Sequence, residues 1–505
     1  MLNKTNLASL AAIGILTVSQ TAFAQDASDA LRYSMLSPQG TARSMGFGNA
    51  LGSVGGDFTS LSVNPAGIGI YRKSEFMFTP SLRFGNTTGS YLGTSTEETK
   101  SAFNFSNIGM IFTRAERGKR YDHSAWKAVS FGIGLNRLAD FNRNYSYGGL
   151  MKTAPGQPNN SFSELFVNDI AQNPGNGTTN GTLGYLGYQT YLVNQDSLGY
   201  YTLASSRLGL NQARSVSEKG GLSELLFSLG GNYQEKLMLG MTVGIPTLRY
   251  SRDAYFQETD ASGNPADGFG SFRYTESLRT SGIGINLKLG MILKPSDYFR
   301  FGLAVHTPTW FSMKDTYDEG LTANTENYKG IQTTNNDQNL FNYNLSTPWR
   351  GIISATGMMG KYGFITADYE YVDYSSMHYS FANDYKTEQT VRNNAIKSTF
   401  QAASNFRIGI EGRLDAFAVR AGFGYYGNPY KNGNNEAMRK DFSLGLGFRG
   451  SRFFTDVAFV HSLYNQTEIP YSIPASALYP SGLIAPTATL NNSMNTIALT
   501  IGWKM

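Results

Sequence analysis

Apolar residues alternate with small or polar residues along most of the chain after residue 75. In the segment 128–136, Val129, Phe131, Ile133 and Leu135 occupy one set of alternate positions, and serine, glycine and asparagine occupy the other. The same period of two recurs in the segments 237–245, 283–291, 442–448 and 496–503. This is the period of a β-strand with one apolar face, so the pattern predicts a chain built mainly from such strands.

Periodicity alone does not separate a soluble β-sandwich from a membrane barrel, but strand length and the connections between strands do. The alternation predicts about fourteen strands, and many run past the five or six residues usual in globular sheets. The expected strands are 75–86, 101–114, 126–148, 222–234, 236–257, 271–293, 299–314, 341–358, 361–380, 398–412, 415–430, 437–449, 452–464 and 493–504.

Short and long connections alternate between these strands. The tight turns are expected at 234–236, 294–298, 359–361, 412–415 and 449–452. The long connections are expected at 149–221, 315–340, 381–397 and 465–492. Short periplasmic turns and long external loops are typical of outer-membrane barrels. The predicted fold class is therefore all-β, a transmembrane antiparallel β-barrel of about 14 strands spanning residues 75–505, with both chain ends on the short-turn side.

Residues 40–71 are dense in glycine and keep neither a helical nor a strand period for more than a few residues. Such a segment buries too little of its own surface to fold alone, so we expect it to plug the barrel. Residues 25–74 are accordingly predicted to form an N-terminal periplasmic or lumenal hatch. The residues predicted to form its gate are Gly46, Gly48, Asp57, Asn64, Pro65, Ala66 and Gly67.

The first 24 residues have the pattern of a secretory signal peptide, with Lys4, an apolar stretch over 7–18 and an A-x-A site at 22–24. The net charge of +5 arises from 42 basic and 37 acidic residues, which is too balanced to predict nucleic-acid binding. The chain has no cysteine, which excludes disulfides, thiol nucleophiles and thiolate metal sites. Mean hydropathy is only −0.29 despite 31 tyrosines and 32 phenylalanines, as expected when apolar residues fill alternate positions.

Aromatic residues gather near the expected strand ends. Trp126 and Trp503 lie at short-turn ends, whereas Trp310 and Trp349 are expected at long-loop ends. Tryptophan concentrates at membrane interfaces because its ring is apolar and its N–H is polar. The four positions therefore predict two interfacial belts.

Two sets of residues are candidates for ligand binding. Ser161 and Glu164 in the longest loop resemble a capping box, and the helix it predicts would carry an apolar face. That face is either packed on its own loop or exposed to capture an apolar ligand, and it consists of Phe162, Leu165, Phe166 and Ile170. The alternation also turns charged side chains inward. Most of these are expected to brace the barrel in pairs, but an arginine could instead bind a ligand carboxylate, the candidates being Arg300, Arg407 and Arg420.

The plug carries a family resemblance. Arg43-Ser-Met-Gly46, Asp57 and Leu61-Ser-Val-Asn64-Pro65-Ala66-Gly67-Ile68 resemble the hatch of the FadL/TodX family of outer-membrane transporters for hydrophobic compounds, with weaker matches at 302–308, 367–375 and 420–429. The resemblance implies a fourteen-stranded barrel in the outer membrane of a Gram-negative bacterium. It also implies that long-chain fatty acids or aromatic hydrocarbons bind in the barrel, pass when the hatch rearranges and leave sideways at a kink in the third strand. Segment 126–148 contains no proline to mark that kink.

We expect a monomeric, non-enzymatic transporter without cofactor or metal, in contact with a hydrophobic ligand, outer-membrane lipid and lipopolysaccharide. An outer-membrane barrel enzyme acting on lipids is the alternative, although the four histidines are scattered and no G-x-S-x-G, H-E-x-x-H or phosphate-loop motif occurs. A structural or adhesin barrel is the third possibility, and it would leave the glycine-rich plug unexplained.

Overall fold

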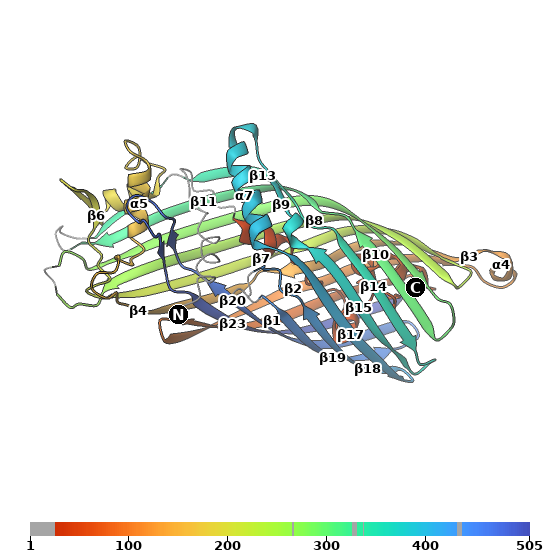
Figure 1. Ribbon diagram of the computed structural model, residues 1–505. Helices are drawn as coiled ribbons and strands as arrows, with labels where there is room; N and C mark the ends of the chain where they lie inside the picture. Colours follow the sequence, from red (N-terminus) through yellow and green to blue (C-terminus); the bar gives the residue numbers. More distant parts are fainter. Residues whose placement is uncertain (1–25, 265–266, 326–330, 337, 432–436) are drawn as a thin grey trace, which may run out of the picture.

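The wall of the molecule is one closed antiparallel β-barrel in the computed structural model, which describes residues 26–264, 267–325, 331–336, 338–431 and 437–505 (Figure 1). Within these residues the wall has fourteen strands, and it closes because the first strand pairs with the last. The wall strands are β1 (Glu75–Tyr91), β2 (Thr94–Ala115), β3 (Trp126–Asp140) continued by β4 (Arg143–Met151), β7 (Leu210–Tyr233), β8 (Leu237–Asp260), β9 (Ser271–Leu293), β10 (Phe299–His306) continued by β11 (Trp310–Asn324), β13 (Asn339–Ser346) continued by β14 (Arg350–Met358), β15 (Gly363–Asp373) continued by β16 (His378–Ser380), β17 (Ala402–Leu414), β18 (Phe417–Tyr426), β19 (Arg439–Arg449), β20 (Phe453–Glu468) and β23 (Ala488–Lys504). The predicted fold class is confirmed. The expected signal peptide, residues 1–24, lies outside the described residues.

Short helices fill the lumen, and further small elements lie in the turns and loops, among them α5 and β6 at the long-loop end and α4 at the short-turn end (Figure 1). Inside the barrel lie α1 (Ala27–Ser34), α2 (Ala42–Gly46), α3 (Ser60–Val63) and η1 (Pro65–Ile70). The turns and loops carry α4 (Lys119–His123), α5 (Glu164–Gln172), α6 (Leu183–Gln189), β5 (Val193–Asp196), β6 (Gly199–Thr202), β12 (Gln332–Asn335), η2 (Tyr374–Ser376), η3 (Asn383–Tyr385), α7 (Lys386–Thr399), β21 (Ser472–Ile473) and β22 (Leu483–Ile484). Among the helices described, none is long and apolar enough to cross a membrane.

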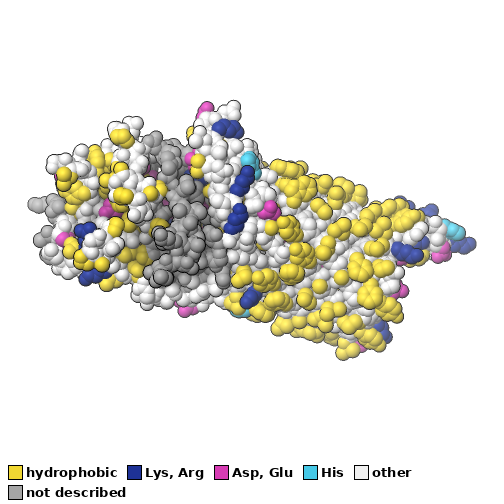
Figure 2. Space-filling model, viewed as in Figure 1, with side chains coloured by type: hydrophobic (Ala, Val, Ile, Leu, Met, Phe, Trp, Pro, Cys, Tyr) yellow, Lys and Arg dark blue, Asp and Glu magenta, His cyan; other side chains and the backbone are white. Residues whose placement is uncertain are grey.

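The apolar face of the wall points outward. Val129 and Phe131 on β3, Leu289 on β9 and Leu444 on β19 are exposed, and Figure 2 shows apolar side chains forming a band over one end of the barrel, next to the short turns. The residues between them are small or polar and lie inward, where Ser130 and Thr242 are 1% and 0% exposed. The faces are therefore arranged as the alternation predicts for a barrel in lipid.

Two wall strands bend inside segments that were expected to be continuous strands, 299–314 and 341–358. Pro308 and Pro348 lie between β10 and β11 and between β13 and β14, and proline has no N–H to give to the sheet. Trp310 and Trp349 follow directly and are exposed. They were expected at long-loop ends, and this is wrong, because β11 and β13 carry the wall further. The exposed tryptophans thus lie at the bends.

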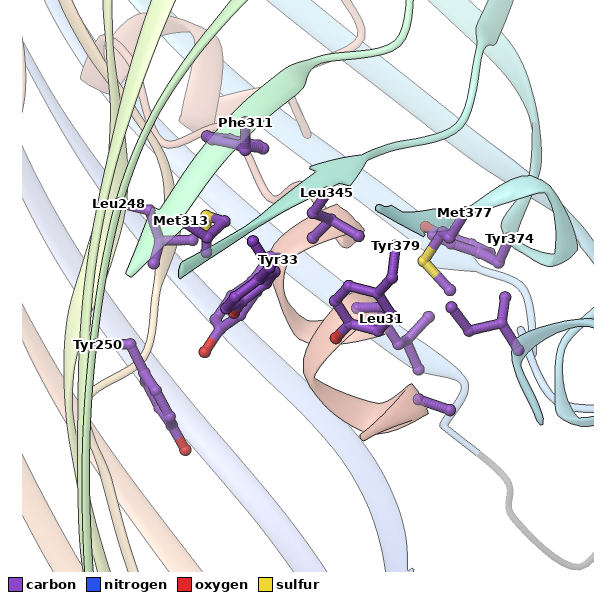
Figure 3. Packing of buried hydrophobic residues seen from close by; sticks show 14 of the residues in the cluster. Leu31, Tyr33, Leu248, Tyr250, Phe311, Met313, Leu345, Tyr374, Met377 and Tyr379 are labelled. Atoms are coloured by element: carbon purple, nitrogen blue, oxygen red, sulfur yellow. The ribbon is translucent and has the colours of Figure 1, made fainter. Parts of the chain in front are cut away.

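The N-terminal end of the described chain lies inside the barrel. The apolar face of α1, including Leu31 and Tyr33, packs against the wall strands and the elements before α7 (Figure 3). The Tyr379 hydroxyl donates to the Asp26 carbonyl over 2.9 Å. The expectation that both chain ends lie at the short-turn side is therefore wrong at Asp26. It holds at the C-terminus, where Lys504 lies opposite Glu75.

Candidate functional site

The Asn64 side chain connects three parts of the structure: the backbone at Gly52, helix η1 and wall strand β9. Its side-chain N–H group donates to the Gly52 carbonyl over 2.5 Å and to the Met291 carbonyl on β9 over 3.1 Å. Its side-chain oxygen accepts from the Ala66 amide over 3.1 Å and caps η1, in which Pro65 is the first residue. Asn64, Pro65, Ala66 and Gly67 are all buried.

The Asp57 carboxylate links residues 57–59 of the hatch to Thr41 at the start of α2. Its carboxylate accepts from the Thr41 hydroxyl over 2.8 Å and from the Thr59 amide over 2.9 Å. Gly46 and Gly48 lie where the hatch contacts the barrel wall. A Cβ on Gly46 would lie 3.0 Å from the Cα of Gly445, and Gly48 has a φ of +72°, so both positions favour glycine.

The wall holds the hatch from several directions. The Asp368 carboxylate accepts from the Gly52 amide over 3.0 Å, and Arg300 donates to the Val54 carbonyl over 2.8 Å. His306 Nε2 lies 2.8 Å from the Val63 carbonyl oxygen. Since the wall satisfies backbone groups of the hatch, the hatch can leave the lumen only if these bonds break. A gate role for its residues stays a prediction.

The other two candidate arginines lie in buried ion pairs. Arg420 is 1% exposed and lies 2.6 Å from Glu411 and 2.8 Å from Asp456. Glu411 also pairs with Arg43 of the hatch at 3.1 Å. Arg407 lies 3.2 Å from Glu370. This is the bracing arrangement, in which buried charges are neutralised by partners. A ligand-binding role for Arg300, Arg407 or Arg420 stays a prediction.

The loop candidates are packed rather than exposed. Phe162, Phe166 and Ile170 are at most 4% exposed, and Leu165 packs against the same apolar cluster beneath the loop. The expected capping box is wrong. The helix starts at Glu164 without a side-chain cap, and the Ser161 hydroxyl and the Phe162 amide instead donate to Glu258 of β8 over 2.5 and 2.9 Å. Burial raises the pKa of the Glu164 carboxyl, and hydrogen bonds from Tyr479 and Asn159 oppose that shift. Ligand binding by these four residues stays a prediction.

The wall is interrupted on one side. Backbone pairing of β2 with β3 runs from Ala115 opposite Ala128 to Asn107 opposite Asn136 and stops there. We call the stretch beyond it, where residues 101–106 face residues 137–142, the lateral gap. A register shift at Pro80 of β1 leaves Ser106 of β2 unpaired, and β3 ends at Asp140. The register shift lies at Pro80 of the first strand, and the third strand contains no proline.

Polar side chains and the hatch fill the lateral gap. Asp140 accepts from Asn104 over 2.7 Å and pairs with Arg137 at 2.9 Å and Arg83 at 3.2 Å. From inside the barrel, the amides of Ser37 and Gln39 donate to the carbonyls of Leu138 and Arg137 over 2.7 and 3.0 Å. We call residues 37–39 the hatch arm. Its amides donate to carbonyl groups of β3 that would bond to β2 in an uninterrupted sheet. The sequence pattern gave no signal for this arm.

A cavity of about 240 Å³ lies directly behind the lateral gap. Leu31, Met35, Met45 and Met494 supply apolar lining, and the hatch arm, Arg83 and Asp140 close it toward the gap. The arginines and carboxylates of the lining also include Arg143, Glu218, Arg439 and Asp441. The Nε atoms of Arg83 and Arg439 are buried with no hydrogen-bond partner among the described residues. The cavity can therefore hold an apolar molecule and still offers hydrogen-bond donors to a polar head.

The histidines lie apart, and none of the side-chain hydrogen bonds described joins a histidine to a serine side chain. His461 Nδ1 lies 2.8 Å from the side-chain oxygen of Asn495, and His123 lies in α4 in a short-turn connection. Among the described residues, no group of three or more His, Asp or Glu side chains is placed to hold a metal ion.

Solved structures resemble this chain over nearly its whole length. No family model and no curated protein matches it. A FadL homologue of Pseudomonas aeruginosa superposes with a TM-score of 0.52 at 13% identity, covering 92% of this chain and 99% of that chain. The deltaS2 mutant of the monoaromatic hydrocarbon channel TodX superposes with a TM-score of 0.50 at 11% identity, covering 92% and 98%. The chain therefore has the fold of the FadL and TodX channels of the outer membrane.

Proposed function

We propose that this chain is an outer-membrane transport protein that takes up hydrophobic compounds, long-chain fatty acids or aromatic hydrocarbons, as a monomer in contact with outer-membrane lipid and lipopolysaccharide. The observation that carries this is the lateral gap, with an apolar-lined cavity behind it and the hatch arm across it. The apolar outer band and the fold shared with the FadL homologue support the location.

In this proposal the ligand occupies the cavity and leaves through the lateral gap once the hatch arm moves. The cavity of about 240 Å³ is smaller than the roughly 300–1,000 Å³ of pockets for drug-sized ligands. A long acyl chain therefore requires displacement of α1 or the arm. The path ends at Phe103 and Phe105, exposed on the outer face of β2, so an apolar ligand passes directly into lipid.

The gap residues provide a test by crosslinking, because the chain has no native cysteine. Asn104→Cys with Asp140→Cys places two thiols across the lateral gap, where the native side chains are hydrogen-bonded. Asn107→Cys with Asn136→Cys is the matched control in the last normal pair, whose side chains also bond over 2.8 Å. Uptake of radiolabelled oleate and of toluene into cells expressing each variant is then measured before and after oxidation.

Oxidation of the gap pair should stop uptake, and a reductant should restore it. Oxidation of the control pair should leave uptake unchanged. Loss of oleate uptake with toluene uptake intact would favour fatty acids as the ligands that need the gap. Unchanged uptake of both probes by the oxidised gap pair would contradict lateral release.

A further inference from the structure

Four exposed cations lie side by side on the outer face of the barrel. The strand register sets them in two neighbouring rows across β7, β8, β9 and β11. Arg249 and Lys314 both lie opposite Ser281. Lys219 and Arg279 both lie opposite Ser251. With the hydroxyl groups of Ser251, Ser281 and Thr316 the four side chains line a concavity of about 410 Å³. We call this cluster the cation row: Lys219, Arg249, Arg279 and Lys314.

The cation row carries excess positive charge. Arg279 pairs with Asp253 at 2.8 Å, and in the part of the chain that the structure describes no carboxylate lies within 4.0 Å of the charged groups of the other three. Like charges on neighbouring strands repel each other, which destabilises a sheet unless an anion lies between them. The row therefore has the composition of an anion site rather than of a surface ion-pair network.

The position of the cation row along the strands indicates which kind of anion it binds. On the same strands, the outward residues toward the short turns become apolar at Leu225, Ile245, Ile283 and Trp310. Arg279 and Ile283 are four residues apart, about 13 Å along a strand. Trp310 lies opposite Ile285 and marks the interface. The cation row thus lies just beyond the apolar band, toward the long loops, at the depth of lipid head groups.

A second, polar concavity of about 720 Å³ continues outward along the same strands. Ser215, Ser217, Thr275 and Asn335 contribute hydroxyl and amide groups to its lining. The Arg273 guanidinium lies 4.5 Å from the centre of the Tyr255 ring. The lining also includes the half-buried Tyr255 ring and the carboxylates of Asp253, Glu276, Asp318 and Glu319. A surface of hydroxyls, amides and carboxylates suits a sugar, whose hydroxyl groups donate and accept hydrogen bonds.

We propose that the outer face of β7, β8, β9 and β11 binds one phosphorylated glycolipid of the outer leaflet. Its acyl chains lie on the apolar band, its phosphates bind the cation row and its sugars enter the polar concavity. Lysine and arginine are the side chains that bind phosphate oxygens by charge-assisted hydrogen bonds. The proposal rests on the proposed outer-membrane location and adds a binding site that is separate from the lumen.

The test measures binding of diphosphoryl lipid A to the purified full-length protein in non-ionic detergent micelles. The variant Lys219→Gln/Arg249→Gln/Lys314→Gln removes the three cations without a carboxylate partner. It should bind roughly a hundredfold more weakly, because each of the three basic residues contributes about a fivefold factor near an anionic lipid. The matched control, Lys119→Gln/Lys361→Gln/Arg452→Gln, removes three exposed cations from turns at the other end of the barrel and should bind as the wild type does.

Three outcomes would overturn the proposal: equal loss in both triple variants, no loss in the first, or equal wild-type binding of dephosphorylated lipid A. Inorganic phosphate displacing the glycolipid at millimolar concentration would instead assign the row to free phosphate and would also overturn it. Uptake of oleate and toluene should be unchanged in the first variant. Failure of the lipid-binding test and failure of the transport proposal are thus separate results.

Discussion

At the residue scale, charged side chains in the lumen form a connected network of ion pairs. Arg420 joins Glu411 of β17 to Asp456 of β20, and Glu411 in turn holds Arg43 of the hatch. The wall and the hatch therefore share one ion network. The period of two was sufficient to predict that Arg420, Glu411 and Asp456 face inward. It could not predict their partners, because those depend on the register between strands.

Arg420→Met should destabilise the folded barrel by about 3–5 kcal/mol, since two buried carboxylates lose a partner. Arg413→Met is the control. Its side chain is 47% exposed and pairs with the same Glu411, so the loss should be at most about 1 kcal/mol. Urea unfolding of each variant in lipid vesicles measures both values. Equal losses would mean that the buried network contributes no more than a surface pair.

At the element scale, each wall strand is defined by its two faces, and this was predictable. On β9, Leu289 is 51% exposed, whereas its neighbour Lys288 is 3% exposed and pairs with Glu224. The lateral gap was not predictable in the same way. It arises from a register shift at Pro80, two strands away from the expected kink, and from the hatch arm, whose pairing with β3 joins residues about a hundred positions apart.

Leu289→Arg should cost about 2–4 kcal/mol of stability in lipid, because it places a charge on the apolar band. Leu289→Val, which keeps the apolar surface, should cost much less. The fraction of each variant that keeps the compact, heat-modifiable form on unheated gels gives the comparison. If both variants fold equally well in vesicles, the outward face does not meet lipid.

At the scale of the whole molecule, the hatch and its place in the lumen were predicted from its lack of periodicity, but the position of α1 was not. Gly40–Gly69 was expected to fill the lumen, and α2, α3 and η1 do so. Helix α1 packs through Leu31 and Tyr33 against wall strands such as β8 and β11. No pattern along the chain predicts these side-chain contacts.

Removal of residues 26–70 should open the lumen to ions. Wild type should conduct poorly in planar bilayers, and the deletion variant should conduct well once its barrel is shown to be heat-modifiable. Asn64→Ala should fall between them, because it leaves the Gly52 carbonyl and the Ala66 amide without their partner. Asn491→Ala on the exposed face of β23 is the matched control. Equally high conductance in wild type and deletion would mean that the hatch is not a gate.

The orientation of the barrel makes a separate prediction. Protease added to intact cells should cut within the loop that carries α5 and α6, between Met151 and Leu210, and spare the turn at 294–298. Permeabilised cells should lose that protection. Cleavage of intact cells at the short turns alone would invert the topology.

The pairing of the first wall strand with the last has a consequence for the order of folding. Thr79 of β1 bonds to Thr500 of β23, 421 residues further along the chain, so the ring is completed only by its final segment. Contacts between distant residues form slowly, because a long loop must close before they form. The hatch precedes every strand and contacts many of them, so it is synthesised before the wall that encloses it. Ring closure therefore traps the hatch inside, and a slow, late step is expected to decide whether it is enclosed correctly.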